Sequence, residues 1–302
     1  MTMRVATFAQ SNLMIADALR VQSVMANEQI QESSGQISTD FGGYGADAQH
    51  VVNLQVSVTR SQSYIDAATL ADSKVQVMYS AVGSMTDLIT KLRSQLSAAS
   101  TGSSTGTTTV ISSAQQMLKE MGSLLNTQYD GQYVFAGGKT ETAPVDLTSF
   151  SSGTGSTTTA DTSYYVGGGE TASVRVSANE TVSYGVNADN AALEEGMRVL
   201  KFVANSSSLS SSDITTALDL SSTALGDTAA VQTRLSSAAS QIETASAHQS
   251  DYKSYAETLS SDLTSVDVAA VTAQISTYQA QITASYSALA KILSMNLASY
   301  LK

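Results

Sequence analysis

The longest run of regular hydrophobic spacing lies between residues 51 and 96. Apolar side chains recur there every seven positions in two interleaved series, which Ser61 and Asp72 interrupt. One series is Val51, Val58, Ile65 and Tyr79, and the other is Leu54, Ala68, Val75, Val82, Ile89 and Leu96. Heptad spacing of this kind is typical of a coiled-coil helix. It predicts one helix from about Ala46 to about Ser97.

A second heptad series occupies the later part of the chain. It consists of Val231, Ala238, Ala245, Tyr252, Leu259 and Val266, alternating with Leu235, Ile242, Gln249, Ala256 and Leu263. We expect this helix to begin near Asp213, whose side chain suits an N-cap. Because each long helix carries one apolar stripe, the pattern predicts that the two helices pack against each other.

The two ends of the chain carry apolar stripes of their own. The N-terminal end has one stripe of Val5, Phe8, Ile15, Leu19 and Ala26 and a second of Met14, Ala18, Val21 and Met25. The C-terminal stripe runs through Val268, Val271, Ile275, Tyr278, Ile282, Tyr286, Leu289, Leu293, Leu297 and Tyr300. Since these ends hold few charges, we expect neighbouring copies of the chain to bury them; the alternative is that they pack on each other within one chain. The candidate subunit-interface residues are Phe8, Ile15, Leu19, Ile275, Ile282, Tyr286, Leu289, Leu293, Leu297, Tyr300 and Leu301.

Between the long helices the composition changes. A Ser/Thr/Gly stretch at 98–109 breaks the first helix, and a shorter helix through Met117 and Leu125 follows. Short β-branched and aromatic runs between Tyr133 and Val186 predict strands, with a loop at 148–163, and a helix resumes near Ala191. The expected fold is mainly α: an elongated body of long antiparallel coiled-coil helices, paired terminal helices and a small β-rich inserted domain.

Five segments follow from this layout. Residues 1–44 and 265–302 are the two halves of a terminal-helix core domain, and residues 45–132 and 191–264 are the two halves of a long-helix domain. Residues 133–190 are the β-rich surface insertion.

Composition narrows the function. The chain of 302 residues has a formal charge of −11, no cysteine and two histidines. This balance argues against binding nucleic-acid phosphates, which requires a basic surface. The missing thiols and scarce imidazoles disfavour enzymes and zinc sites. Residues 268–290 hold no charge, but their many Ser, Thr and Gln side chains argue against a membrane span.

Each motif with possible chemistry has a simpler structural interpretation. Asp40-Phe41-Gly42-Gly43 and Gly167-Gly168-Gly169 lack the partner motifs of kinases and phosphate-binding loops, so we expect a helix break and a turn. His50 and His248 are expected on helix surfaces. Glu194 and Glu195 are adjacent on a helix and do not face each other. The sequence therefore predicts no catalytic, cofactor-binding or metal site, and no cofactor.

Several segments together resemble a known family. They are Met3–Thr7, Ser33–Ile37, Gln128–Gly138, Tyr184–Ala191 and the end from Leu263 to Leu301, including Ser294–Leu301. Over essentially its full length the chain resembles the flagellin superfamily of bacterial flagellar axial proteins, and these segments are similar to its hook–filament junction branch. The chain departs from the family at Phe41–Ala46, where an Asp-Asp-Pro or Asp-Asp-Ala sequence is usual.

The resemblance implies a structural subunit, not an enzyme, whose terminal helices self-assemble in the core of a tube. It implies export through the flagellar type III apparatus without a cleaved signal peptide and an extracellular place in the flagellum. The implied partners are identical subunits, other axial proteins (hook-associated protein or flagellin) and an export chaperone, with neither nucleic acid nor membrane. A filament-forming flagellin, and a secreted binding module that uses the β insertion, stay open as alternatives.

Overall fold

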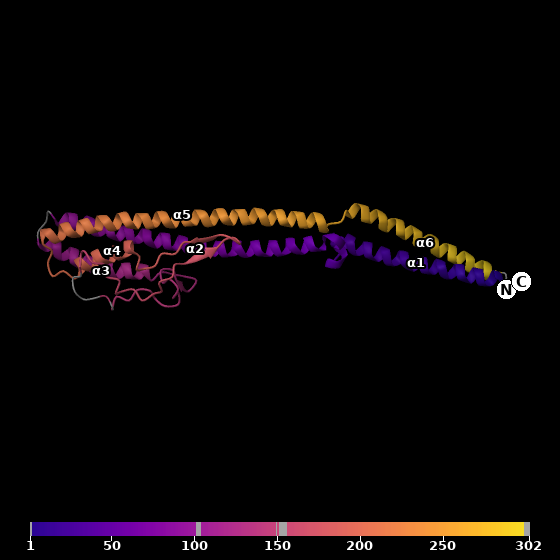
Figure 1. Cartoon of the computed structure of the whole chain (residues 1–302), viewed down its shortest axis with the longest axis horizontal. Coiled ribbons are helices and arrows are strands. Elements are labelled where there is room, and N and C mark those ends of the chain that lie inside the picture. Colours follow the sequence, from indigo (N-terminus) through magenta and orange to yellow (C-terminus); the bar gives the residue numbers. More distant parts are fainter. Residues whose placement is uncertain (1, 101–103, 149, 151–155, 299–302) are drawn as a thin grey trace. The chain divides into compact units, whose positions relative to one another are not determined.

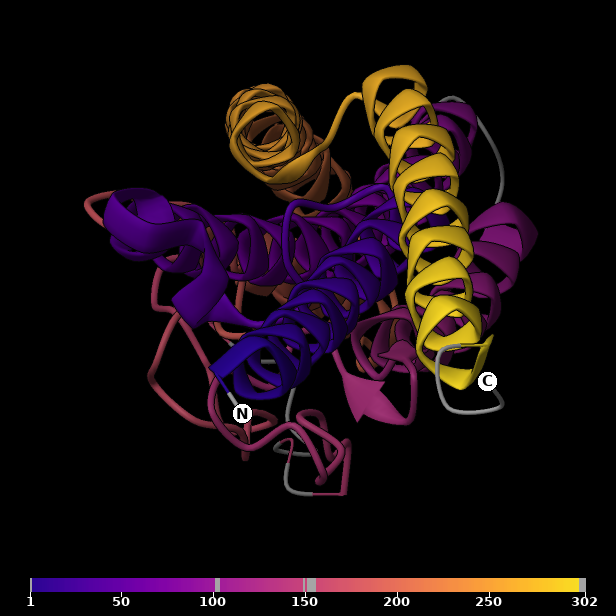
Figure 2. The same ribbon diagram turned by 90° about the vertical axis from the view of Figure 1, so that its right-hand side faces the viewer.

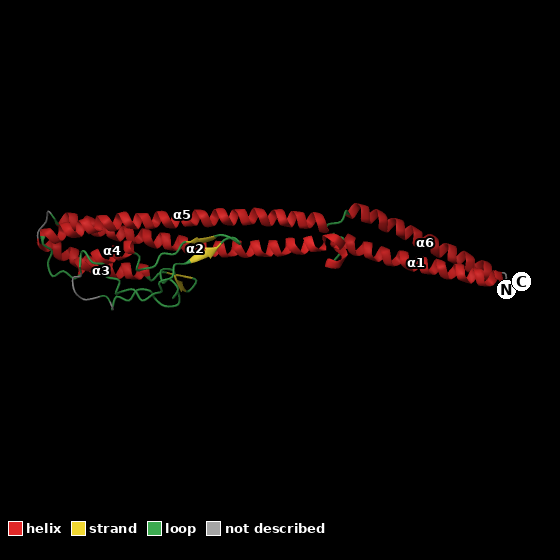
Figure 3. Cartoon of the chain, viewed as in Figure 1, coloured by secondary structure: helices red, strands yellow, loops and turns green. Residues whose placement is uncertain are grey.

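The computed structural model describes residues 2–100, 104–148, 150 and 156–298. Its helices are α1 (Thr2–Ser34), α2 (Ala48–Ala99), α3 (Ser104–Leu125), α4 (Ala191–Ala204), α5 (Ser211–Thr264) and α6 (Val268–Ala298). Figure 3 shows how far helix dominates the chain. The mainly helical fold predicted from the sequence is thus confirmed. Contacts divide the chain into two compact units, residues 1–59 with 253–302 and residues 60–252.

The first unit contains the paired terminal helices. α1 and α6 lie side by side, as the indigo and yellow ribbons of Figure 2 show. An antiparallel bridge between Gln36 and Ser265 joins the segments at which α1 ends and α6 begins. The Ile37 amide donates to the Thr264 carbonyl at 2.8 Å, and the Val266 amide donates to the Gly35 carbonyl at 3.0 Å. These bonds fix the register of the two terminal helices.

A 3₁₀ helix, Phe41–Asp47, separates α1 from α2. Gly45 has a φ of 56°, a conformation that residues with a Cβ rarely adopt. The Tyr44 hydroxyl donates to the Ser38 carbonyl at 2.5 Å. The helix break expected at this Gly-rich segment is present.

The second unit is built around α2 and α5, which pair as predicted. The Ser61 hydroxyl donates to Gln249 Oε1 at 3.1 Å across the pair. Val75, Val82, Ile89 and Leu96 are fully buried on α2, facing a core to which α5 contributes Leu235 and Ile242. The long apolar stripes are therefore buried against each other.

The predicted stripes are wrong at three aromatic or apolar positions. Tyr79 is 44% exposed, Tyr252 is 49% exposed and Leu259 is 36% exposed. On α2 the buried series that accompanies Val75 is Ala71, Met78, Met85, Leu92 and Ala99, one position earlier than predicted. The step from buried Ala68 to buried Ala71 is three residues, where the heptad requires four, and a discontinuity of this kind shifts the register of a coiled-coil stripe. The shift brings Met78 into the packed face and leaves Tyr79 outside it.

α3 and α4 pack on each other beside α2 and α5 (Figure 1). Gly196 allows the closest approach, because a Cβ there would lie 3.0 Å from both Ile89 Cδ1 and Met121 Cε. The Asn190 side chain caps α4 by accepting from the Ala192 amide at 3.2 Å.

The N-cap of α5 is Ser210, which corrects the predicted start at Asp213. The Asp213 amide donates to Ser210 Oγ at 3.2 Å, and Asp213 Oδ2 accepts from the Ser210 amide at 2.9 Å. This reciprocal pair is a capping box, in which the acidic residue occupies the third helical position and the serine the cap.

The segment between α3 and α4 is less β-rich than predicted. Its strands are β1 (Gln128–Tyr129) with β2 (Gln132–Tyr133), and β3 (Ser173–Arg175) with β4 (Thr181–Ser183), each pair antiparallel. Most of the remaining described residues are loop and turn (Figure 3). The β-branched runs instead fill a core: Phe135, Tyr164 and Val176 are fully buried and continuous with the helical core. Burial, not ladder hydrogen bonding, accounts for their apolar character.

Candidate subunit-interface surface

The two apolar stripes of α1 have different surroundings. Ala18 is 7% exposed, and its stripe companions Met14, Val21 and Met25 are half-buried on the side of α1 that packs against α6. In the other stripe, Ile15 is 41% exposed and Leu19 is 58% exposed. One face of α1 therefore pairs with α6 within the chain, as the alternative expectation had it. The other face is exposed, and its burial by neighbouring copies stays a prediction.

The predicted residues of α6 divide in the same way. Ile275 is 6% exposed and lies in the contact with α1, while Ile282 and Leu289 are half-buried. Tyr286, at the edge of the same stripe, is 51% exposed. The side chain at Ile275 therefore serves the pairing of α6 with α1.

The open residues of the two helices form one composite surface. From the Gln36–Ser265 bridge, an antiparallel register places Tyr286 level with Ile15 and Ile282 level with Leu19. At 100° per residue, Tyr286 and Val268 lie to the same side of the packed face as Ile15, Leu19 and Ile30. We call this set, Ile15, Leu19, Ile30, Val268 and Tyr286, the terminal apolar face.

Some candidate residues are not placed by their side chains. Phe8 lies within α1, and Leu293 and Leu297 lie within α6, but their side chains are outside the described part of the structure. Tyr300 and Leu301 lie outside the described residues altogether. Their assignment to an interface stays a prediction.

Sequence reasoning missed two exposed residues on another side of α1. Leu13 is 67% exposed and Val24 is 37% exposed. The two are 11 residues apart, which is close to three full helical turns, and this spacing was the available signal. α1 thus presents apolar side chains to solvent on two sides.

The terminal apolar face has almost no charge. Arg20 and Asp17 form an exposed ion pair at 3.5 Å on α1, and α6 has no charged residue before Lys291. Exposed apolar patches of this kind are typical of surfaces that bind another protein or a membrane. Among the described residues, no helix is both long and apolar enough to cross a membrane. Nor does any cluster of three or more His, Asp or Glu side chains in that part of the chain suit a metal ion.

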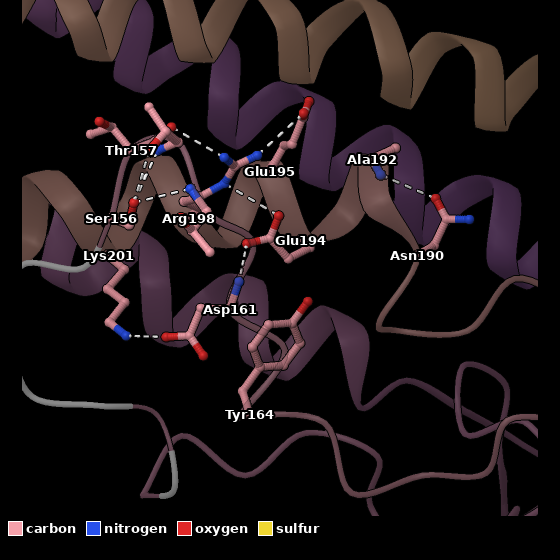
Figure 4. A network of polar contacts seen from close by, with 12 residues as sticks. Ser156, Thr157, Asp161, Tyr164, Asn190, Ala192, Glu194, Glu195, Arg198 and Lys201 are labelled. Carbon is pink, nitrogen blue, oxygen red and sulfur yellow. Dashed lines mark hydrogen bonds and ion pairs between the residues drawn. The ribbon is translucent and has the colours of Figure 1, made fainter.

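Glu194 and Glu195 belong to one buried polar cluster on α4 (Figure 4). Both contact one guanidinium: Glu194 Oε2 lies 3.2 Å from Arg198 Nε, and Glu195 Oε1 accepts from Arg198 Nη2 at 3.2 Å. The two glutamates do not face each other, as expected, but Arg198 at i+4 and i+3 reaches both. That spacing was readable in the sequence and was missed.

The same cluster holds the segment 156–164, which we call the strap. Asp161 donates its amide to Glu194 Oε1 at 2.9 Å, and Arg198 Nη1 donates to the Thr157 carbonyl at 3.1 Å. Lys201 Nζ lies 2.5 Å from Asp161 Oδ2 and 4.0 Å from the centre of the Phe150 ring. The Tyr164 hydroxyl donates to the Ala188 carbonyl at 2.9 Å, and burial raises the pKa of this phenol. These contacts anchor the strap.

The other motifs lie apart from both sites. His50 and His248 are exposed on α2 and α5, as expected. Gly168 lies against Gly137, where φ is 60° and an added Cβ would come within 2.3 Å of the Gly168 carbonyl oxygen. The glycines at 167–169 therefore permit a close backbone crossing.

Comparison with known proteins gives a family match for the N-terminal part of the chain. Residues 5–140 match the family model of the bacterial flagellin N-terminal helical region. The chain carries a flagellin N-terminal region. The resemblance to the flagellin superfamily is thereby confirmed for a part that includes α1, α2 and α3. None of the curated proteins matches the chain.

Two solved structures were found similar to this chain, and the first shares its fold. One, assigned as a flagellar hook-associated protein from Vibrio parahaemolyticus, aligns with a TM-score of 0.59 at 15% identity and covers 75% of this chain and 99% of its own. Another, FlgL from Bacillus cereus, aligns with a TM-score of 0.48 at 16% identity and covers 70% of this chain and 98% of its own. At 15% identity, the similarity to the first structure shows a shared fold and nothing more.

Proposed function

We propose that the chain is a structural subunit of the bacterial flagellum that assembles with copies of itself through the terminal apolar face. The observation that carries this proposal is the exposure of Ile15, Leu19 and Tyr286 on paired helices of which α6 has no charged residue before Lys291. The flagellin N-terminal region supplies the flagellar context.

Burial of the terminal apolar face by a neighbouring subunit can drive assembly. Burying one large apolar side chain that water now reaches contributes about 1.5–3 kcal/mol. A neighbour that covers the face with a different part of its own surface makes a heterologous contact, and repetition of such a contact with a rotation that does not close gives a helical tube. The candidate residues beyond Ile292 extend the same stripe, and we assign them to the same interface.

Within the flagellum, we assign the chain to the hook–filament junction. The fold shared with the Vibrio parahaemolyticus protein supports this assignment, as do the sequence segments similar to the junction branch. The flagellin family match favours a second candidate, a filament-forming flagellin. The number of subunits in each flagellum separates them, because a filament needs thousands of copies and a junction about one helical turn.

The remaining assignments follow from this role. The protein has no catalytic activity, works outside the cell as part of the flagellum, and is exported without a cleaved signal peptide. Its partners are identical subunits, hook-associated protein or flagellin, and an export chaperone. Residues 1–44 and 265–302 form the assembly core, and 133–190 form a surface segment.

The test is a substitution on the open face of α1. Leu19→Gln is expected to abolish assembly, seen by electron microscopy of flagella in a deletion strain complemented with the variant. Its circular dichroism at 222 nm should match that of the unaltered chain. The matched control is Val56→Gln on α2, at 49% exposure, which should still assemble. Normal flagella with Leu19→Gln would refute the proposed interface.

A further inference from the structure

Three charged side chains of α4 lie buried beneath the strap. Glu194, Arg198 and Lys201 are spaced by four and three residues, so they share one side of the helix, and we call them the charged stripe. Their side chains are 2%, 11% and 2% exposed. Charged side chains are rarely buried to this extent without partners. Figure 4 shows that the strap supplies a partner to each of the three.

Polar contacts hold the strap on α4. No side chain of the described residues 156–163 is buried: those of Thr157 and Asp161 are half-buried and the others are exposed. The Asp161 amide and the Thr157 carbonyl bond to the charged stripe at 2.9 Å and 3.1 Å. The Asp161 carboxylate lies 2.5 Å from Lys201 Nζ. Residues 156–163 thus add no apolar side chain to the core.

The strap also has hydrogen bonds of its own. Ser156 Oγ accepts from the amides of Thr158 and Thr159 at 3.2 Å and 3.0 Å. Asp161 Oδ1 accepts from the Ser163 amide at 3.1 Å. None of these three bonds involves α4. They therefore persist when the strap leaves the helix, and the strap moves as one unit.

Tyr164 fixes one end of the strap. Its side chain is fully buried, and its hydroxyl donates to the Ala188 carbonyl at 2.9 Å. Its ring packs edge-on against Phe150, with 5.1 Å between the ring centres. The Tyr164 carbonyl also accepts from the Asp146 amide at 2.9 Å. Because none of these partners belongs to α4, Tyr164 stays in place when the contacts with the charged stripe break.

Breaking those contacts exposes groups that water solvates well. Desolvation of a buried ion pair offsets much of the attraction between its charges, so the net gain on closing is small. When the strap leaves α4, Lys201 and Glu194 regain their hydration. A segment that covered apolar side chains would instead return them to water, which costs free energy in proportion to their area. The strap therefore has the properties of a segment that opens locally.

We propose that the strap is a lid on α4 that opens as one unit about Tyr164, with the ion pair between Asp161 and Lys201 as its latch. α4 stays folded in the open state, because Leu193 and Met197 remain fully buried in the helical core. This lid does not depend on the proposed assembly, since its contacts lie within one chain.

Hydrogen exchange in the soluble full-length chain tests the lid. The Asp161 amide reports on the strap, because its acceptor is Glu194, and the amides of α4 report on the helix. Corrected for intrinsic rates, the Asp161 amide should exchange at least about tenfold faster than the slowest amides of α4. Low urea should accelerate exchange in α4 but not at Asp161, because opening of the strap exposes little surface. Equal protection with equal urea dependence would overturn the lid.

Asp161→Asn tests the latch. The hydrogen bond from Lys201 is the main cause that lowers the pKa of Asp161 to about 2, so the ionised carboxylate is the form that Lys201 holds. The variant keeps the size of the side chain but loses its charge, and the amide at position 161 should exchange about tenfold faster. Exchange in α4 should not change.

The matched control is Asp219→Asn, which removes the same charge from an exposed position on α5. It should leave exchange at position 161 unaltered. If Asp161→Asn accelerated the strap and α4 equally, the strap would be part of the core; if it accelerated neither, the ion pair would not be the latch. The comparison within the unaltered chain needs no variant to fold, and none of these measurements depends on assembly.

Discussion

Lys201 and Asp161 form an ion pair in which the lysine side chain is almost completely buried. The lysine side chain is 2% exposed, and its ammonium nitrogen lies 2.5 Å from Asp161 Oδ2. The Phe150 ring covers the ammonium group on another side, with its centre 4.0 Å away. A buried ammonium group has lost its hydration, so it stays charged only because partners such as these compensate for that loss. Helix α4 and the loop residues before and within the strap are therefore coupled energetically.

Removal of the Asp161 carboxylate should cost more stability than removal of the Lys201 ammonium group. Asp161→Ala leaves the ammonium group buried without its counter-ion, and we expect the free energy of unfolding to fall by about 2 kcal/mol, less than for a fully buried pair because Asp161 is 29% exposed. Lys201→Met removes the charge while keeping an apolar stem against Phe150, so its loss should be smaller. Urea unfolding at pH 7 measures both, and equal losses would contradict the argument.

The Lys201–Asp161 ion pair also predicts that the free energy of unfolding falls in acid. The folded pKa of Asp161, about 2, is below the reference value of 3.8, so its contribution is present above pH 4 and disappears towards pH 2. The difference in unfolding free energy between the unaltered chain and Asp161→Asn should shrink over that interval. Parallel curves for the two proteins from pH 5 to pH 2 would overturn the assigned shift.

The packed face of α2 gives a stability prediction with a matched control. Leu92 is fully buried, whereas Leu70 on the same helix is 47% exposed. Leu92→Ala should lower the free energy of unfolding by about 3 kcal/mol, because it removes buried methyl groups and leaves a cavity. Leu70→Ala should change it by less than about 1 kcal/mol. Chemical unfolding followed at 222 nm checks both, and a reversed order would place the packed face elsewhere.

The sequence predicted the helices well because their period is long and repeated. α2, observed at Ala48–Ala99, was expected from about Ala46 to about Ser97. The errors came where a local pattern has two physical explanations. Tyr79 fits the heptad that precedes Ala71 but not the register that follows it, and the β-branched runs near Val176 fit a strand as well as a buried loop. Only the tertiary structure decides between them.

Composition did not reveal the anchoring residues of the loop at 148–163. Its Ser, Thr and Gly content predicted a loop, and within it Phe150 is buried and Asp161 pairs with Lys201. Single anchoring residues do not alter the average composition of a loop, so no pattern revealed them. On the terminal helices, by contrast, the sequence identified Ile15, Leu19 and Tyr286 but could not say which stripe pairs within the chain.

The capping box of α5 predicts a specific effect at Ser210. Ser210→Ala removes the acceptor for the Asp213 amide and should cost about 1 kcal/mol. The hydrogen bonds from Ser210 also lower the pKa of Asp213, so this contribution is present above its unfolded pKa and is lost as the pH falls. Ser208→Ala, in the exposed loop before the cap, is the control. Thermal unfolding at pH 7 should separate the two variants, and equal Tm values would argue against Ser210 as the cap.

The two faces of α6 should respond differently to the same kind of truncation. Ile275 is 6% exposed in the contact with α1, so Ile275→Ala is expected to weaken the pairing of the terminal helices by about 2–4 kcal/mol. Faster hydrogen exchange in α1 and α6 of the soluble chain would show this loss. Val268→Ala, at 45% exposure, should leave exchange in the soluble chain unchanged and reduce assembly instead, because its side chain lies on the terminal apolar face. If Val268→Ala accelerated exchange as much as Ile275→Ala, the division of α6 into a packed face and an open face would be wrong. If both variants assembled normally and exchanged normally, neither face would have the role assigned to it.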